Sequence, residues 1–101
     1  YIIMIEILIQ PSKKADKKFD AIIDGKKTVS FGAKGYSDFT KHGSEARKQR
    51  YLDRHKAREN WNDPTTAGAL SKFVLWNKPT IAASVKDMDK QFKNYKIKLA
   101  P

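Results

Sequence analysis

The first ten residues restrict the fold more than any other segment, because nearly all of them are β-branched or apolar. Isoleucine occupies positions 2, 3, 5, 7 and 9, and such residues favour an extended strand that is buried on at least one face. The sequence therefore predicts a first strand over Tyr1–Gln10. This run is much shorter than the roughly 20 residues that span a bilayer, and Pro11 follows it, so neither a membrane anchor nor a signal peptide is expected.

Two further strands are predicted after a polar turn. Phe19–Ile23 and Lys27–Phe31 flank the dipeptide Asp24-Gly25, which favours a β-hairpin with a type I′ turn. We therefore expect residues 1–31 to form a three-stranded antiparallel β-meander.

The middle of the chain changes from strand to loop to helix. Glycines and polar residues predict an ordered loop over residues 32–43, with Tyr36 and Phe39 as candidate anchors to the core. Ser44 then begins a helix that is expected to run to about Arg58, since the serine can cap the first amides and no glycine or proline interrupts the segment.

Two more helices are predicted further along. Asp63 with Pro64, or alternatively Thr66, is expected to cap the first, and Pro79 to end it. Thr80 is expected to cap the second. The apolar and polar residues that mark these helices are Leu70, Phe73, Val74 and Asn77 on the first, and Ile81, Val85, Met88 and Phe92 at helical spacing on the second.

The tail over residues 94–101 alternates apolar side chains with lysine. It could add a strand to the edge of the sheet or clasp a neighbouring subunit. The predicted fold is thus one α+β domain over residues 1–101, in which the meander is followed by the loop, a helical part over 44–93 and this extended tail.

A chain of 101 residues can build only one modest core, which agrees with a single domain.

The charge of the chain indicates which kinds of partner the domain attracts. Its 21 lysines and arginines against 11 acidic residues give a formal charge of +10, which attracts polyanions such as nucleic acid, anionic lipid or acidic protein faces. The charge sums to +2 over residues 1–40, +4 over 41–59 and +4 over 60–101, so the positive charge is spread along the chain and is not confined to one basic tail. The absence of cysteine excludes a disulfide scaffold and fits a reducing compartment.

Arginine placement is the most informative pattern. All four arginines of the chain, Arg47, Arg50, Arg54 and Arg58, fall in one predicted helix at steps of three, four and four, which puts them on one face. Arginine binds carboxylate or phosphate through its planar fork, so the stripe predicts a helix that grips a phosphate backbone or an acidic partner. Tyr51 and His55 border it. The alternative is a solvated face whose arginines pair with the acidic residues Glu45, Asp53 and Glu59.

Aromatic and glycine patterns are less specific. Trp61 and Trp76 could stack on bases, but core packing or a protein interface explains them better, because neither lies in a β-strand platform with basic neighbours. The glycines between Phe31 and Tyr36 lack the GxxxxGK[ST] pattern of a phosphate loop, so turn geometry explains them.

Catalysis has weak candidates. Two histidines and no cysteine are a poor metal set. A histidine nuclease would need a second histidine downstream of Asp53, His55 and Asn60, which is missing. We expect no enzymatic activity, no cofactor, no metal and no small-molecule substrate. The acidic and histidine residues considered as candidates for catalysis are His42, His55, Asp38, Asp53, Glu59 and Asp63.

The middle of the chain resembles a family of uncharacterised small basic proteins encoded by large nucleocytoplasmic DNA viruses, the giant viruses. The likeness extends over about Thr28–Phe92. Its distinctive pieces are Phe31-Gly32, Tyr36–Thr40, Arg50–His55, Asn60–Pro64, Thr66–Gly68 and Leu75–Thr80. The resemblance implies a viral setting, in which a minor capsid component beneath or between major capsomers is expected, and it supplies no catalytic residues.

Two functions are consistent with these observations. The first is a minor capsid protein that links or lines capsid subunits, located in the virion and in the host cytoplasm during assembly, with major and minor capsid proteins as partners. The second is a nucleic-acid-binding protein for viral DNA packaging or regulation. Both use the same partner-binding residues, namely Arg47, Arg50, Arg54, Arg58, Tyr51, Trp61 and Trp76.

Overall fold

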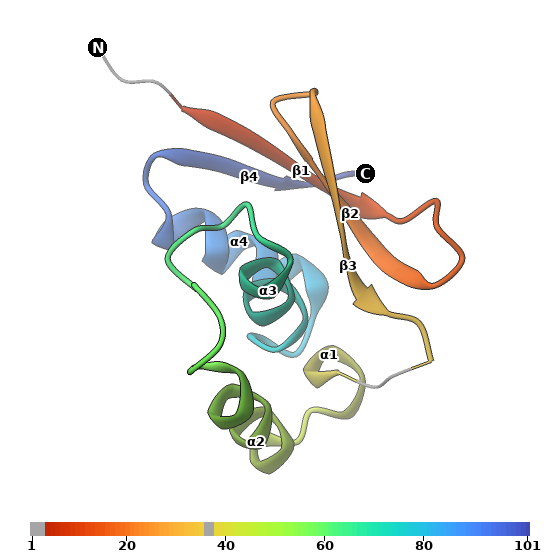
Figure 1. Cartoon of the computed structure of the whole chain (residues 1–101), viewed down its shortest axis with the longest axis vertical. Helices are drawn as coiled ribbons and strands as arrows, with labels where there is room; N and C mark the ends of the chain where they lie inside the picture. The colour runs from red at the N-terminus through yellow and green to blue at the C-terminus, as the bar shows by residue number, and fades with distance from the viewer. Residues whose placement is uncertain (1–3, 36–37) are drawn as a thin grey trace.

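The computed structural model describes residues 4–35 and 38–101, except for the side chain of His42. Within these residues a four-stranded sheet packs through one face against helices (Figure 1). The elements in chain order are β1 (Ile5–Pro11), β2 (Lys17–Ile23), β3 (Lys27–Ala33), α1 (Phe39–His42), α2 (Glu45–His55), α3 (Ala67–Leu70), the π-helix η1 (Ser71–Leu75), α4 (Ile81–Gln91) and β4 (Tyr95–Leu99).

The strands follow the order β3-β2-β1-β4. β1 pairs antiparallel with β2, and β2 antiparallel with β3, which confirms the predicted meander of three antiparallel strands. β4 lies beside β1 in parallel, with Ile7 opposite Ile97, so the sheet as a whole is mixed. The predicted tail therefore becomes an edge strand, one of the two places that the sequence left open for it.

The turn between β2 and β3 has the backbone that its residues predict. Asp24 has a φ of 52° and Gly25 a φ of 68°, and the N–H of Lys26 donates to the carbonyl of Ile23 at 3.0 Å. A type I′ turn requires positive φ at both central positions, which glycine adopts freely and aspartate adopts more readily than most residues. The dipeptide thus sets the register of the hairpin.

The core lies between the inner face of the sheet and the C-terminal helices. Ile7, Ile9 and Phe31 of the sheet are fully buried, and Leu70 and Met88 meet them from the helices. The helical spacing predicted for α4 is confirmed, because Val85 and Met88 are buried while Ile81 and Phe92 pack against the cluster. The remaining buried apolar members are Ala21, Ala69, Phe73, Val74, Leu75, Val85 and Ile97.

Three predicted helix caps are present. The side chain of Ser44 accepts a hydrogen bond from the N–H of Arg47, and Thr80 accepts one from Ala83. Of the two caps considered for the middle helix, Thr66 is the one that forms, by accepting from the N–H of Ala69. These oxygens satisfy amide donors that the first turn of a helix leaves without carbonyl partners.

The middle helix differs from its prediction in form. α3 continues directly into η1, where the N–H of Trp76 donates to the carbonyl of Ser71 at 3.2 Å in the wider spacing of a π-helix. Asn77, expected on this helix, lies beyond its end. The sequence carries no signal for the change of helix type.

Other boundaries were wrong by a few residues. α2 ends at His55, and in the turn that follows Arg58 and Glu59 both donate their N–H to the carbonyl of His55. The loop predicted over 32–43 begins later, since β3 runs to Ala33, and it contains α1. Asp38 caps this helix by accepting from the N–H of Thr40, and Gly43 ends it with a φ of 62°. Tyr36, the candidate anchor, and Tyr1–Ile3 of the first predicted strand lie outside the described residues.

Within residues 4–35 and 38–101, none of the helices combines the length and the apolar character that crossing a bilayer requires.

Candidate anion-binding cleft

The face of α2 that carries the arginines borders a cleft of about 660 Å³. Its other sides come from β2 and β3 of the sheet, from the start of α1 and from η1, so five separate segments of the chain build it. We call it the arginine cleft. Its lining residues are Arg47, Arg50, Tyr51, Arg54 and His55 from α2, Lys18, Gly32 and Ala33 from the sheet, Asp38 before α1, and Ser71, Leu75 and Trp76 from the η1 region.

Aromatic stacking holds α2 in this position. Tyr51 is the buried residue of the helix, and its ring stacks on Trp76 with 4.4 Å between centroids and 4° between planes. The ring of His55 lies 4.3 Å from that of Tyr51. Two rings this close to a third must occupy its opposite faces, so Tyr51 is covered on both sides.

A lysine adds a second attachment. Lys48 extends from α2 and donates to the backbone carbonyl of Asn77 at 2.7 Å, while its ammonium lies 4.8 Å from the ring centroid of Phe39. A cation near an aromatic face is attracted by the ring quadrupole. α2 is thereby joined to α1 and to the segment after η1, and its position relative to the cleft is defined.

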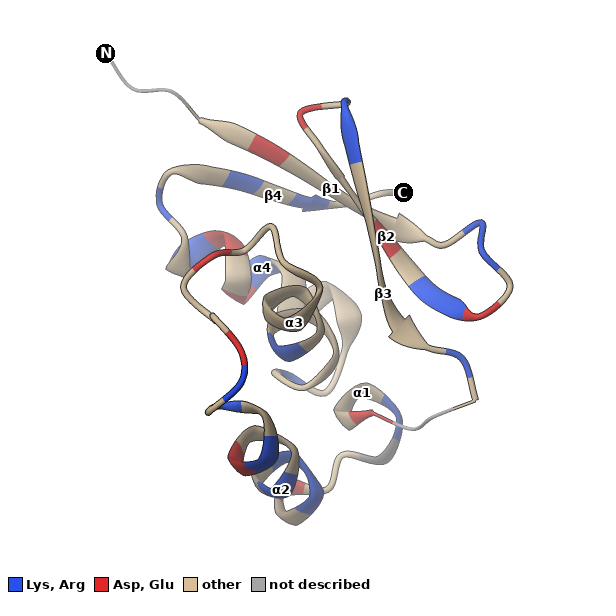
Figure 2. Cartoon of the chain, in the orientation of Figure 1, with Lys and Arg blue, Asp and Glu red and all other residues tan. Residues whose placement is uncertain are grey.

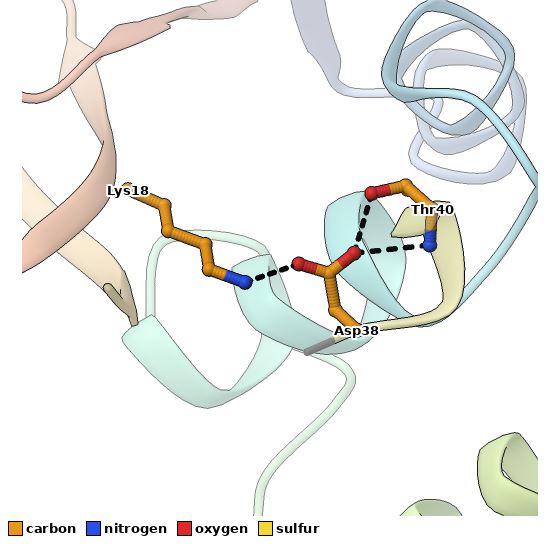
Figure 3. A network of polar contacts seen from close by, with 3 residues as sticks. All are labelled: Lys18, Asp38 and Thr40. Carbon is orange, nitrogen blue, oxygen red and sulfur yellow. Dashed lines mark hydrogen bonds and ion pairs between the residues drawn. The ribbon is translucent and has the colours of Figure 1, made fainter. Parts of the chain in front are cut away.

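The acid and the lysine that line the cleft are engaged with each other. Lys18 of β2 donates to the carboxylate of Asp38, which also accepts from the N–H and hydroxyl of Thr40 (Figure 3). Burial alone would raise the pKa of Asp38, but these hydrogen bonds outweigh it and hold the pKa of this carboxyl below its ordinary value. Asp38 is therefore ionised, and its charge is balanced by Lys18.

Unlike Lys18, the four arginines form no ion pair with any carboxylate among the described residues. Two of the three acids considered as their partners have other neighbours, since Asp53 accepts from Gln49 at 3.0 Å and Glu59 lies 3.7 Å from His55. Figure 2 shows the concentration of basic residues along α2. The cleft thus presents a net positive charge.

The structure brings together five of the seven partner-binding residues named from the sequence, which are Arg47, Arg50, Arg54, Tyr51 and Trp76. Arg58 is not among them, because it lies in the exposed turn after the end of α2.

Trp61 also lies away from the cleft. Its ring packs against the core, with the ammonium of Lys72 4.8 Å from the centroid. Its Nε1 is buried without a hydrogen-bond partner within the described part of the chain.

Several lining residues could not be predicted from the sequence because they are distant in the chain. Among them, Gly32 is the residue whose type gives a signal in the sequence. A glycine is suited to a positive φ, and the φ of Gly32 is 77°. A Cβ at this position would lie 2.7 Å from Cδ1 of Leu75, so the glycine also permits β3 to approach η1 closely. Lys18 and Ser71 carried no signal, because only the tertiary fold brings them to α2.

The candidate catalytic residues whose side chains the structure describes do not assemble into a site. Asp38 and His55 both line the arginine cleft, but Asp38 is engaged by Lys18 and Thr40. Asp63 accepts from Thr65 in a local turn, and the side chain of His42 lies outside the description. No group of three or more histidine, cysteine or acidic residues that could hold a metal is found where the structure is described.

Comparison with known proteins gives a partial match. Residues 7–55 are similar to a family of unknown function (DUF5754). The match begins in β1 and ends with the last residue of α2, so it contains most of the meander, α1 and the arginines that line the cleft, and it leaves out the side formed by η1. Neither a curated protein nor a solved structure matches the chain significantly.

Proposed function

We propose that this protein is a structural, non-enzymatic minor capsid protein of a large DNA virus, which attaches to an anionic part of a neighbouring capsid protein through the arginine cleft. The viral setting rests on the resemblance over Thr28–Phe92. The mode of attachment rests on one observation: Arg47, Arg50 and Arg54 line a single cleft and form no ion pair with a described carboxylate.

Guanidinium groups without an internal acid in a concave site favour an anionic partner. Walls of low dielectric concentrate the electric field of like charges inside a cleft. Each guanidinium can also form two parallel hydrogen bonds with a carboxylate or phosphate. An isolated surface pair contributes little, about 0–1 kcal/mol, but a hydrogen bond to a charged group that loses water on binding contributes about 1.5–3 kcal/mol. Three such groups together can support a specific attachment.

The concave shape favours a protein segment over duplex DNA. A helix that reads duplex DNA projects its side chains into a groove about 12 Å wide. Here the arginines share a cleft of about 660 Å³ with β3 and η1, so a partner has to insert a narrow anionic group. The location that goes with the proposed capsid role is the virion, with the host cytoplasm as the place of assembly.

The capsid role is tested by quantitative mass spectrometry of purified particles and of infected cells. We expect the protein in particles at a fixed ratio to the major capsid protein. Its presence in infected cells together with its absence from particles would refute the proposal.

Nucleic-acid binding is the second candidate, favoured by charge that extends beyond the cleft. Three exposed lysines in and after α4, Lys86, Lys90 and Lys93, are one example. For this function we expect micromolar or tighter DNA binding that weakens steeply with salt. Replacement of Arg47, Arg50 and Arg54 by glutamine should reduce the slope of log K against log salt by about 0.7–0.9 for each phosphate that the protein no longer neutralises.

The matched control replaces the same number of charges elsewhere. The triple variant Lys86→Gln, Lys90→Gln and Lys93→Gln changes the net charge equally and leaves the cleft intact. Equal slopes for both triple variants would indicate that DNA senses only the total charge, and would exclude the cleft as the DNA site.

A further inference from the structure

The two sides of the arginine cleft differ in chemical character. Arg47, Arg50 and Arg54 form the cationic side along α2. The other parts of the chain contribute small or apolar surface from Gly32, Ala33 and Leu75, together with polar groups from Lys18, Asp38 and Ser71. Lys18 and Asp38 form an ion pair, so a bound segment meets net positive charge along α2 and, away from it, a side without net charge that includes apolar surface.

The cationic side has a repeat along its length. Positions 47 to 54 cover about 10 Å of helix axis at 1.5 Å per residue, and neighbouring arginines have Cβ atoms about 5–6 Å apart. In an extended peptide, side chains two residues apart point the same way and are separated by about 6.6–6.8 Å. Three carboxylates on alternate residues thus approximate the spacing of three arginines.

Single-stranded nucleic acid fits this site less well. Its binding in grooves combines phosphate contacts with base stacking on aromatic rings, each stacked base contributing about 1–3 kcal/mol. Of the three rings that line the cleft, Tyr51 lies between Trp76 and His55, which stack against it. Both faces of Tyr51 are therefore covered, and Trp76 and His55 each have one face occupied by this stack, which reduces the ring surface on which a base can stack.

We propose that the arginine cleft binds an extended acidic segment of a partner protein, in which glutamate or aspartate alternates with small or apolar residues. The carboxylates pair with Arg47, Arg50 and Arg54, and the intervening side chains face Ala33 and Leu75. This assignment deepens the proposed function and rests on it for the existence of an anionic protein partner.

The test compares two fluorescent peptides of equal composition and charge. One contains the alternating order Glu-Val-Glu-Val-Glu, and the other groups the same residues as Val-Val-Glu-Glu-Glu. Fluorescence anisotropy at low salt should show tighter binding of the alternating peptide by about tenfold, which corresponds to one well-formed contact of about 1.4 kcal/mol. Equal affinities would overturn the alternation.

Variants assign the binding to the cleft. The triple variant Arg47→Gln, Arg50→Gln and Arg54→Gln should lose at least about tenfold in affinity. The triple lysine variant of the α4 region, which removes the same charge, should stay within about twofold. Similar losses in both variants would overturn the assignment to the cleft.

A second variant acts from the opposite side. Ala33 is exposed at the end of β3, so Ala33→Glu adds a carboxylate to the cleft with little effect on packing. It should weaken the alternating peptide by about tenfold through repulsion and competition for the arginines. Unchanged affinity in this variant, with native circular dichroism, would contradict the proposed site.

An oligothymidine of matched charge serves as the competing ligand. If it binds the cleft more tightly than the alternating peptide, and loses affinity with the arginine variant alone, the occupant is nucleic acid and the inference is overturned. The particle experiment is independent of this one, because absence from virions would refute the capsid role without altering the affinity for either peptide.

Discussion

α2 and α4 have the same length, 11 residues each, yet they are used in opposite ways. α4 buries Ser84, Val85 and Met88 against the core, whereas Tyr51 is the one residue that α2 buries among those described. The acids of α4 are bound within the fold, since Asp87 accepts from Asn77 and Asp89 accepts from the N–H of Ile97. On α2, by contrast, Arg47, Arg50 and Arg54 form no ion pair with a described carboxylate. Burial and internal hydrogen bonding thus distinguish a helix that stabilises the fold from one that presents a surface.

The largest effect should come from the core side of α4. Met88 is fully buried, and Met88→Ala should reduce the free energy of unfolding by about 2–5 kcal/mol, because it removes apolar contacts and leaves a cavity. Urea denaturation followed by circular dichroism measures this. The exposed neighbour Lys86→Ala should change stability by less than about 0.5 kcal/mol. A loss under about 1 kcal/mol for Met88→Ala would remove the contrast between the two helices.

An alkaline effect of intermediate size should come from the buried anchor of α2. Burial, with a smaller contribution from the charge of Glu59, raises the pKa of the Tyr51 phenol from 10.0 to about 12. Between these values the unfolded chain loses the phenolic proton while the folded chain keeps it, so stability falls as the pH rises. The loss should be at most about 2 kcal/mol, allowing for residual solvent contact.

Tyr51→Phe isolates this contribution, because it keeps the ring stack on Trp76 and removes the titrating group. The difference in unfolding free energy between this variant and the unmodified protein should change between about pH 9 and pH 12, in favour of the variant. A constant difference over that interval would show that the phenol is accessible to water and that α2 is less firmly attached than its rings indicate.

The smallest effects should come from the caps of the two helices. Thr80→Ala and Ser44→Ala each remove a side-chain oxygen that accepts from a first-turn amide, at a cost of about 1 kcal/mol. Loss of the α4 cap should lower global stability. Loss of the α2 cap should mainly raise local opening, seen as faster hydrogen exchange in residues 45–55 with little change in the denaturation midpoint. The same global loss for both variants would mean that α2 unfolds only with the core.

Local signals predicted the local structure well. The type I′ turn depends on Asp24 and Gly25 alone, and the caps at Ser44, Thr66 and Thr80 each depend on one side chain and the next turn. α1 also has such a signal, because Asp38 precedes it and Gly43 follows it. Its four residues are too short to show a helical period, so the sequence favours a loop there.

The features of the fold and of the cleft that the sequence did not predict depend on contacts between residues far apart in the chain. The alternation of Tyr95, Ile97 and Leu99 indicates a strand, but its parallel place beside β1 follows from the packing of α4 against β4. The arginine spacing predicts one face of α2, whereas the opposite side of the cleft requires Gly32 and Leu75 to meet across more than 40 positions of sequence. The sequence places Arg58 in the same helix because no proline or glycine ends it at His55.

The position of β4 has a consequence for synthesis and folding. β1 is an interior strand only when Tyr95–Leu99 pair with it, so during translation its isoleucine-rich backbone stays an open edge until nearly 90 more residues have emerged. Open apolar edges recruit strands from other chains. Newly made protein should therefore need either rapid completion or a chaperone, and premature termination before residue 95 should yield an aggregating fragment.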